Sequence, residues 1–215
     1  MIITVQKPLD EILESLSPYT SILVAGCDGC TQPPRGLREA RTLSQLLELG
    51  AKLKGKELKC KATTLPKQCD SYLTLSPLQA QIENMEAILS LACGLGPQTI
   101  AQVLPNLPVF PAQNTLFIGA EIREDSAIEE RCAACGDCLL ASTGGICPVS
   151  RCAKSLLNGP CGGSQNGKCE IDPEQDCAWD LIVNRLEKLG RLADLEQIRP
   201  PRNFGQVARP GRIKG

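Results

Sequence analysis

The stretch Ile22-Leu-Val-Ala-Gly-Cys27 indicates the fold of the first half of the chain. Four consecutive apolar residues are followed by a glycine and a cysteine, a pattern typical of a buried strand that runs into a tight turn. A second run, Ala87-Ile-Leu-Ser-Leu-Ala92, is likewise followed by a cysteine and a glycine, Cys93 and Gly94. Both runs are short and are bounded by turn residues, so they predict buried strands.

Leucine-rich stretches between these strands have the spacing of amphipathic helices. One of them, residues 36–49, places its leucines on one face and is predicted to end at Gly50. Helix and strand therefore alternate over residues 1–120, which predicts an α/β domain, a small parallel sheet with flanking helices. The other predicted helices begin at Pro8 and Pro97, and the other predicted strands are Leu58–Thr64 and Thr115–Ile118.

Four cysteines of this domain follow the predicted strands. In an open parallel sheet, ligands collect beyond the carboxyl ends of the strands. Cys27 and Cys93 stand at such ends, and Cys30 and Cys69 lie in the loops that follow. We predict that these four hold a metal centre, with Cys60 as a spare inside a strand. The alternatives are that Cys27 and Cys93 are small core residues, or that Cys27 and Cys30 form a thioredoxin-like redox pair or half of a zinc site.

The composition of the whole chain limits the kinds of catalytic and metal site that it can form. It has 215 residues, 13 cysteines, no histidine and a net charge of −1. Without histidine no Ser–His or Cys–His catalytic pair can form, and a structural zinc site needs four cysteines. The balanced charge favours neither nucleic acid nor a membrane surface, and no apolar run approaches the ~20 residues that span a bilayer. The N-terminal sequence has no signal or transit pattern, so we expect a cytoplasmic protein whose reduced thiols bind metal.

Residues 121–195 follow a different pattern, rich in glycine and poor in large apolar residues. Burial alone cannot stabilise such a segment, so it needs covalent or metal cross-links. This predicts a metal-stapled domain of irregular and α-helical structure. Its motif Cys132-Ala-Ala-Cys135-Gly-Asp-Cys138 lets three thiolates reach three corners of an iron–sulfur cube, and Cys147 precedes a proline as ferredoxin ligands do. The predicted ligands in this domain are Cys132, Cys135, Cys138, Cys147, Cys152, Cys161, Cys169 and Cys177.

Eight thiolates suit two 4Fe–4S clusters, whose ligand sets can interleave, or one cluster and one four-cysteine zinc site. Zinc alone, in a redox-silent structural knuckle, is the remaining alternative.

Three further segments have recognisable patterns. The acidic residues Glu121, Glu124, Asp125, Glu129 and Glu130 predict a solvated linker helix. Asp172, with a proline after it, predicts the start of a helix that packs through Trp179 and ends at Gly190. Residues 196–215 are basic and contain prolines, which predicts an extended or disordered tail.

Seven short motifs occur in order between Cys132 and Leu195. They are Cys132-x-x-Cys-x-x-Cys-Leu139, Thr143-Gly-Gly-Ile-Cys-Pro148, Arg151-Cys-Ala-Lys154, Leu157-Asn-Gly-Pro-Cys-Gly-Gly163, Gly167-Lys-Cys169, Asp176-Cys-Ala-Trp179 and Arg185-Leu-x-x-Leu-Gly190. As a block they resemble the C-terminal cysteine-rich domain of the methylenetetrahydrofolate reductase family. In acetogenic and related anaerobes this domain occurs in a small subunit that is paired with the flavin-containing catalytic reductase.

The resemblance implies a role in one-carbon metabolism, in the reduction of 5,10-methylenetetrahydrofolate to 5-methyltetrahydrofolate. Flavin and folate would belong to the catalytic subunit, a TIM barrel that this chain is too short to contain. This chain would be a non-catalytic subunit that passes electrons toward that flavin through two or three 4Fe–4S clusters. It would also dock the catalytic subunit to an electron-donor complex.

One departure concerns the first domain, because Pro33-Pro34 stand where a ferredoxin-like loop would have a third cysteine soon after Cys30. Two alternative functions remain open. One is a zinc-bound, redox-silent structural subunit of the same complex. The other is an independent thiol oxidoreductase acting through Cys27 and Cys30, although no acid–base partner is apparent near that pair.

Overall fold

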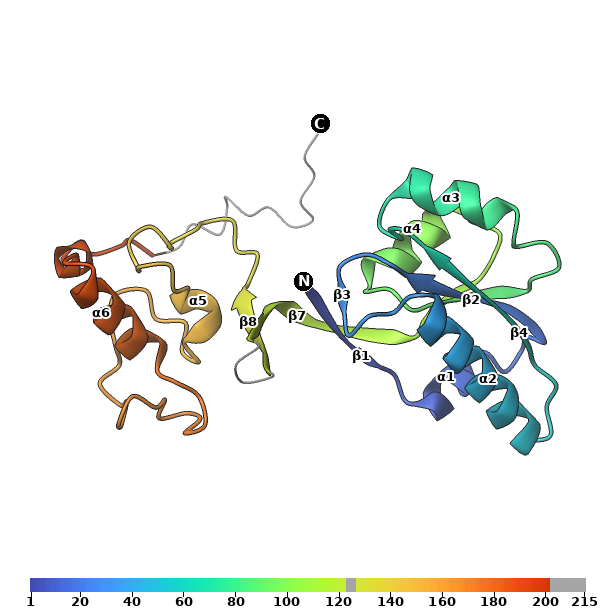
Figure 1. Ribbon diagram of the computed structural model, residues 1–215, viewed down its shortest axis with the longest axis horizontal. Coiled ribbons are helices and arrows are strands. Elements are labelled where there is room, and N and C mark those ends of the chain that lie inside the picture. The colour runs from blue at the N-terminus through green and yellow to red at the C-terminus, as the bar shows by residue number, and fades with distance from the viewer. Residues whose placement is uncertain (123–126, 202–215) are drawn as a thin grey trace. The chain divides into compact units, whose positions relative to one another are not determined.

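The fold is that of a computed structural model, which describes residues 1–122 and 127–201 (Figure 1). The chain divides into two compact units, Met1–Phe117 and Ile118–Gly215. Glu124 and Asp125 of the acidic stretch lie outside the described residues, as do residues 202–215 of the basic tail. In the part of the chain that is described, no helix has the length and apolar character needed to cross a membrane.

The first unit is built on a four-stranded parallel sheet with the strand order β4-β2-β5-β6. Its central strand β2 pairs with β4 along its whole length, from Ser21 opposite Lys59 to Cys27 opposite Leu65. The predicted parallel sheet is therefore confirmed. Its strands are β2 (Ser21–Cys27), β4 (Lys59–Leu65), β5 (Ala87–Ser90) and β6 (Val109–Pro111).

Helices cover both faces of this sheet (Figure 1). Successive side chains of β2 point to opposite faces, so Ile22 and Val24 enter one core while Leu23 and Ala25 enter the other. All four side chains are 0% exposed, as a strand buried on both faces requires. The helices are α1 (Leu9–Ser15) and α2 (Leu37–Leu53) on the first face, and α3 (Ser71–Gln79) and α4 (Leu95–Val103) on the second.

The sequence predicted that α2 ends at Gly50, and this prediction is wrong. The helix continues to Leu53, and Gly50 lies against α1, where an added Cβ would come within 2.8 Å of the Leu13 Cδ1 atom. This glycine therefore allows two helices to approach closely.

A second sheet has the strand order β3-β1-β7-β8. The predicted strand Thr115–Ile118 is confirmed but belongs to this sheet, as part of β7. Strands β7 and β8 are antiparallel, with Ile118 opposite Cys132 and a register shift between Ile118 and Gly119. The strands are β1 (Ile2–Gln6), β3 (Thr31–Gln32), β7 (Gln113–Ile122) and β8 (Ala127–Cys132).

The predicted linker helix over the acidic stretch is wrong, because its described residues lie in β7 and β8. The Glu129 carboxylate binds Arg131 at 2.7 Å and Arg151 at 3.3 Å. Residues 129 and 131 share a face in a strand, whereas they point to different sides of a helix. The strand is therefore the form that lets one carboxylate serve both arginines.

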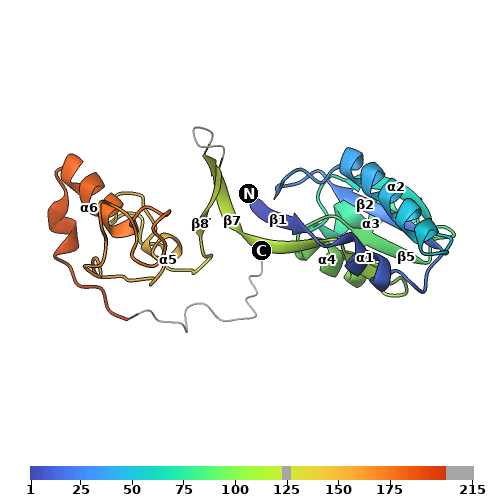
Figure 2. The same cartoon turned by 90° about the horizontal axis from the view of Figure 1, so that it is seen from below.

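The rest of the second unit is irregular, with long loops between two helices, α5 (Pro148–Arg151) and α6 (Ala178–Lys188), and a 3-10 helix, η1 (Leu192–Leu195) (Figure 2). Trp179 on α6 is 2% exposed, and its ring N–H donates to the Leu156 carbonyl oxygen at 3.1 Å. The predicted packing role of Trp179 is confirmed. The irregular and α-helical character is as predicted, while the metal staple stays a prediction.

The start of α6 differs from the prediction. Asp172 caps only a turn, in which its carboxylate accepts from the Glu174 N–H at 3.1 Å. The segment after this turn is held in extended pairing, because the Cys169 N–H donates to the Gln175 carbonyl and the Cys177 N–H to the Gly167 carbonyl. The helix therefore begins only at Ala178.

The predicted end of α6 at Gly190 is confirmed. Gly190 has a φ of 65°, and the Arg191 N–H donates to the Leu186 carbonyl at 2.8 Å. This is the left-handed C-cap that glycine favours.

Candidate metal centres

Three adjacent strands carry cysteines to one edge of the parallel sheet. Because β4, β2 and β5 are parallel neighbours, their carboxyl ends meet at the same edge. Cys27 is the last residue of β2, and Cys30 lies in the loop that follows. Cys69 lies between β4 and α3, and Cys93 between β5 and α4. The topology thus gathers the four cysteines that the sequence singled out.

The Cys93 thiol interacts electrostatically with the other three thiols of this group. Burial raises the pKa of the Cys93 thiol, a hydrogen bond from the Leu95 backbone lowers it, and the Cys30, Cys69 and Cys27 thiolates raise it further. Cys27 and Cys93 are buried, at 8% and 7% exposure, while Cys30 and Cys69 are exposed. The group therefore has a buried side and a side open to solvent.

Cys60 stands apart from this group, inside β4. Burial, together with the nearby carboxylate of Glu48, raises the pKa of the Cys60 thiol to about 12. Cys60 stands opposite Ile22 at the beginning of β2, so it lies at the other end of the sheet from Cys27, as expected of a spare cysteine.

Gln68 joins the three segments that carry this cysteine group. Its side chain is 0% exposed, and its amide nitrogen donates to the carbonyl oxygens of Ala25 at 2.9 Å and Gly26 at 2.7 Å. Its amide oxygen accepts from the Ser90 hydroxyl at 2.6 Å. Gln68 precedes Cys69, and its partners precede Cys27 and Cys93 on their strands. Sequence reasoning missed this residue, since a polar side chain in a loop gives no sign of being fully buried.

The loop after β2 is fixed by close backbone contacts. The Cys27 N–H donates to the Arg35 carbonyl at 2.7 Å, and the Asp28 carboxylate accepts from the Thr64 hydroxyl at 2.9 Å. An added Cβ at Gly26 would lie 2.6 Å from the Gly36 carbonyl oxygen. The next helix begins only at Leu37, so Cys27 and Cys30 lack the helix N-terminus that lowers thiol pKa values in thioredoxin-like pairs.

In the second unit, Cys132 ends β8 and opens the loop of the three-cysteine motif. The Cys132 sulfur accepts from the Ala134 N–H at 3.4 Å. Ala134 and Gly136 have φ angles of 49° and 75°, which turn the loop sharply. Cys147 directly precedes α5, and α5 packs against β8. The contact between β8 and α5 therefore brings together the segments that carry Cys132 and Cys147.

The other four cysteines of this unit line one small cavity, together with charged residues and Trp179. The Cys177 side chain is buried beside Trp179 in the core of the unit, and Cys161 is exposed. The lining of the cavity includes Cys152, Cys161, Cys169, Cys177, Arg151, Lys154 and Glu170. This grouping separates them from Cys132, Cys135, Cys138 and Cys147.

Among residues 1–122 and 127–201, no three or more Cys, Asp or Glu side chains are arranged to hold one metal ion. A 4Fe–4S cube binds its four thiolates through four different irons, so its ligands lie farther apart than those of one ion. The donor sets described here contain only thiolates, which is the chemistry of iron–sulfur clusters and of zinc.

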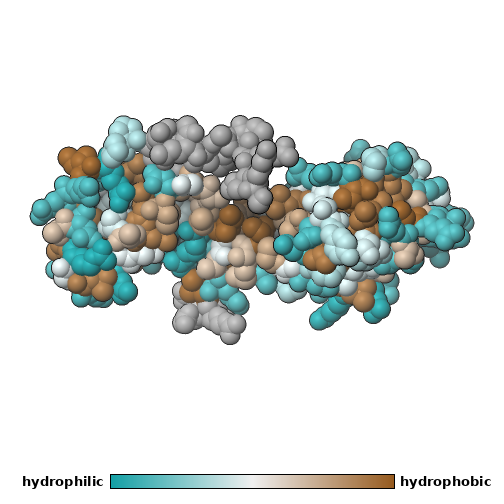
Figure 3. All heavy atoms as spheres, turned by 90° about the horizontal axis from the view of Figure 1, so that it is seen from above, coloured by the Kyte–Doolittle hydropathy of each residue, from teal (hydrophilic) through white to brown (hydrophobic). Residues whose placement is uncertain are grey.

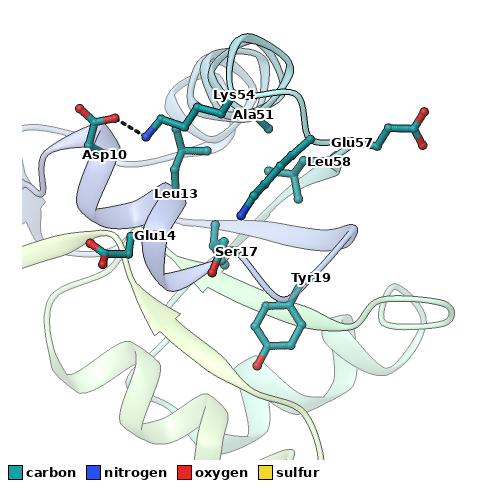
Figure 4. Close-up of a pocket in the computed structure, with 11 residues that line it drawn as sticks. Asp10, Leu13, Glu14, Ser17, Tyr19, Ala51, Lys54, Glu57 and Leu58 are labelled. Carbon is teal, nitrogen blue, oxygen red and sulfur yellow. Dashed lines mark hydrogen bonds and ion pairs between the residues drawn. The ribbon is translucent and has the colours of Figure 1, made fainter.

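A larger cavity, of about 360 Å³, lies between the ends of α1 and α2 (Figure 4). Two of its lining residues, Asp10 and Lys54, form an ion pair at 2.6 Å, and the lining also includes Tyr19 and Leu58. Those two residues precede β2 and β4, so this cavity is at the opposite end of the sheet from the cysteines. No cysteine lines it.

Residues 110–205 match the family described as the methylene-tetrahydrofolate reductase C terminal. The match to the reductase C-terminal family contains all eight cysteines of the second unit and leaves Cys27, Cys30, Cys69 and Cys93 outside it. No curated protein and no solved structure matches the chain. The resemblance stated from the sequence motifs is thus confirmed.

Proposed function

We propose that this chain is an iron–sulfur electron-transfer subunit of a methylenetetrahydrofolate reductase complex. The observation that carries the proposal is the group of Cys27, Cys30, Cys69 and Cys93 at the carboxyl edge of three adjacent parallel strands. Four thiolates at one edge supply the ligands of one 4Fe–4S cluster, which transfers one electron at a time.

The surroundings of this first site suit electron exchange with another protein. Cys30 and Cys69 are exposed, so a cluster there would be within reach of a partner. Tyr72 is 79% exposed, Leu95 56% and Leu73 39%, and all three are within four residues of a proposed ligand. Figure 3 shows apolar side chains gathered on the face of the first unit from which α3 projects. Aromatic and aliphatic side chains around a redox site are suited to a protein contact.

The second unit supplies two further sets of four thiolates. We assign Cys132, Cys135, Cys138 and Cys147 to one cluster, on the spacing of the motif and the packing of α5 on β8. We assign the cavity that contains Cys152, Cys161, Cys169 and Cys177 to a second centre. This cavity adjoins the Trp179 core, and a closed structural zinc ion is the alternative there.

The match of residues 110–205 to the reductase C-terminal family supports the choice of partner. Electrons would pass from the clusters to the flavin of the catalytic subunit, and flavin and folate would be bound by that subunit alone. The chain itself would then be non-catalytic and would receive its electrons from a donor complex.

The test is electron delivery by the full-length chain, purified without oxygen. The reduced protein is mixed with oxidised flavin-containing reductase, and flavin absorbance is followed together with cluster absorbance. The proposal predicts that flavin bleaches as the clusters are reoxidised. Cys30→Ala should slow this transfer at least tenfold, whereas Cys60→Ala, the matched control, should not. A flavin that stays oxidised, or equal rates for the two variants, would contradict the proposal.

A further inference from the structure

The side chains of Lys154, Glu170 and Cys161 form a connected chain in the cysteine cavity of the second unit. The Lys154 amine pairs with the Glu170 carboxylate, and the same carboxylate oxygen lies 3.2 Å from the Cys161 sulfur. Both Lys154 and Glu170 line the cavity that contains the four cysteines. A single carboxylate oxygen of Glu170 therefore contacts both the Lys154 ammonium and the sulfur of Cys161, a proposed metal ligand.

The Glu170 carboxylate occupies the space beside Gly163. Its carboxylate lies directly against Gly163, where an added Cβ would be 2.1 Å from Oε2 and 2.2 Å from Cδ. A side chain at position 163 would force this carboxylate to move. Glu170 in turn holds the Lys154 amine at the rim of the cavity.

The charge of an all-thiolate centre explains why a cation belongs here. Four thiolates around a doubly charged ion or cluster leave a net charge of about −2, which is costly to hold in a partly buried site without nearby cations. Arg151 also lines the cavity, but its guanidinium is engaged by Glu129 at 3.3 Å. Lys154 differs because its partner carboxylate directly adjoins a ligand sulfur.

We infer that Lys154 is a charge-compensating residue of this centre and donates a hydrogen bond to the metal-bound Cys161 thiolate. When Cys161 is a thiolate, its contact with Glu170 places two anions side by side, and the Lys154 amine on that same oxygen is positioned to donate to the sulfur. Donors of this kind orient ligands and raise metal affinity. The inference rests on the proposed function, since it requires that the four cysteines hold metal.

The experiment titrates the metal-free, reduced full-length chain with Co²⁺, which reports bound thiolates through its sulfur-to-cobalt absorption bands. Lys154→Met removes the charge but keeps the aliphatic stem, and Lys154→Arg restores a cation. Lys168→Met is the control, because Lys168 lies in the same loop region and its ammonium binds Asp176 at 2.8 Å. We expect one cobalt equivalent to bind about 10–100-fold more weakly in Lys154→Met, largely recovered in Lys154→Arg and unchanged in Lys168→Met.

The site of the effect is checked in a Cys161→Ala background, which removes the same cobalt equivalent. In that background Lys154→Met should have no further effect on cobalt affinity. Equal cobalt affinities for wild type and Lys154→Met would overturn the inference and leave the metal site standing. A wild-type chain that binds neither Co²⁺ nor, after reconstitution, iron and sulfide through the thiolates of this cavity would instead overturn the proposed site itself, and the inference with it.

Discussion

The amide oxygen of Gln68 accepts a hydrogen bond from the Ser90 hydroxyl at 2.6 Å. This contact joins the loop that bears Cys69 to the strand that precedes Cys93, and the amide nitrogen extends the link to the end of β2. One buried side chain thus holds together the segments on which the first cysteine group depends. Polar groups at such depth are costly to leave without partners.

Gln68→Ala is therefore expected to loosen this edge of the sheet. The Ser90 hydroxyl loses its acceptor and two strand carbonyls lose one donor each, although the Ala25 carbonyl still accepts from the Leu91 N–H. We expect the free energy of unfolding to fall by about 2–3 kcal/mol. Denaturant unfolding of the metal-free chain measures this change, with the exposed Gln79→Ala as control. Equal stability of the two variants would show that the Gln68 contacts do not hold the loops.

Gly26→Ala is expected to displace the loop after β2. The new Cβ would stand 2.6 Å from the Gly36 carbonyl oxygen, and backbone cannot move aside cheaply. We expect a loss of about 1–3 kcal/mol in unfolding free energy, in line with overpacking elsewhere in proteins. Gly94→Ala is the matched control, because Gly94 has a helical φ of −54° and its Cβ would lie 3.6 Å from the Thr115 hydroxyl. A small loss of unfolding free energy in Gly26→Ala together with a large loss in Gly94→Ala would contradict the expectation.

Cys60 should be the least reactive cysteine of the folded, metal-free chain. Because burial raises the pKa of its thiol to about 12, Cys60 is almost wholly protonated at pH 8, and its thiolate fraction grows only as the pH rises toward that value. Alkylation with iodoacetamide at pH 8, followed by mass spectrometry, measures the rate at each cysteine. Labelling of Cys60 as fast as the exposed Cys30 would contradict this protonation state.

Trp179 should report metal binding in the adjacent cysteine cavity. It is the single tryptophan of the chain and lines that cavity with Cys152, Cys161, Cys169 and Cys177. A paramagnetic ion or a cluster bound there should quench its fluorescence, which is read directly during a Co²⁺ titration. The quenching should disappear in Cys161→Ala. Fluorescence that falls equally in that variant would place the bound metal elsewhere.

Much of the first unit follows from local sequence patterns. The runs beginning at Ile22 and Ala87 are strands because continuous apolar residues must be buried on both faces of a parallel sheet. The placement of Cys27 and Cys93 at one edge then follows from the rule that parallel strands share their carboxyl ends.

What the sequence did not reveal depends on contacts between distant residues. Asp172 has the local features of a helix start, but backbone pairing of Cys169 with Gln175 keeps the chain extended. Gly50 has the features of a helix end, but it serves a contact with Leu13. The buried position of Gln68 likewise depends on hydrogen bonds to three residues from other segments.

The most direct test of the central claim is the iron, sulfide and zinc content per full-length chain purified without oxygen. Two or three 4Fe–4S clusters correspond to roughly eight to twelve iron atoms with matching sulfide, and this is the predicted result. Zinc with little iron would mean closed four-cysteine sites, and the proposed electron-transfer role would then be wrong.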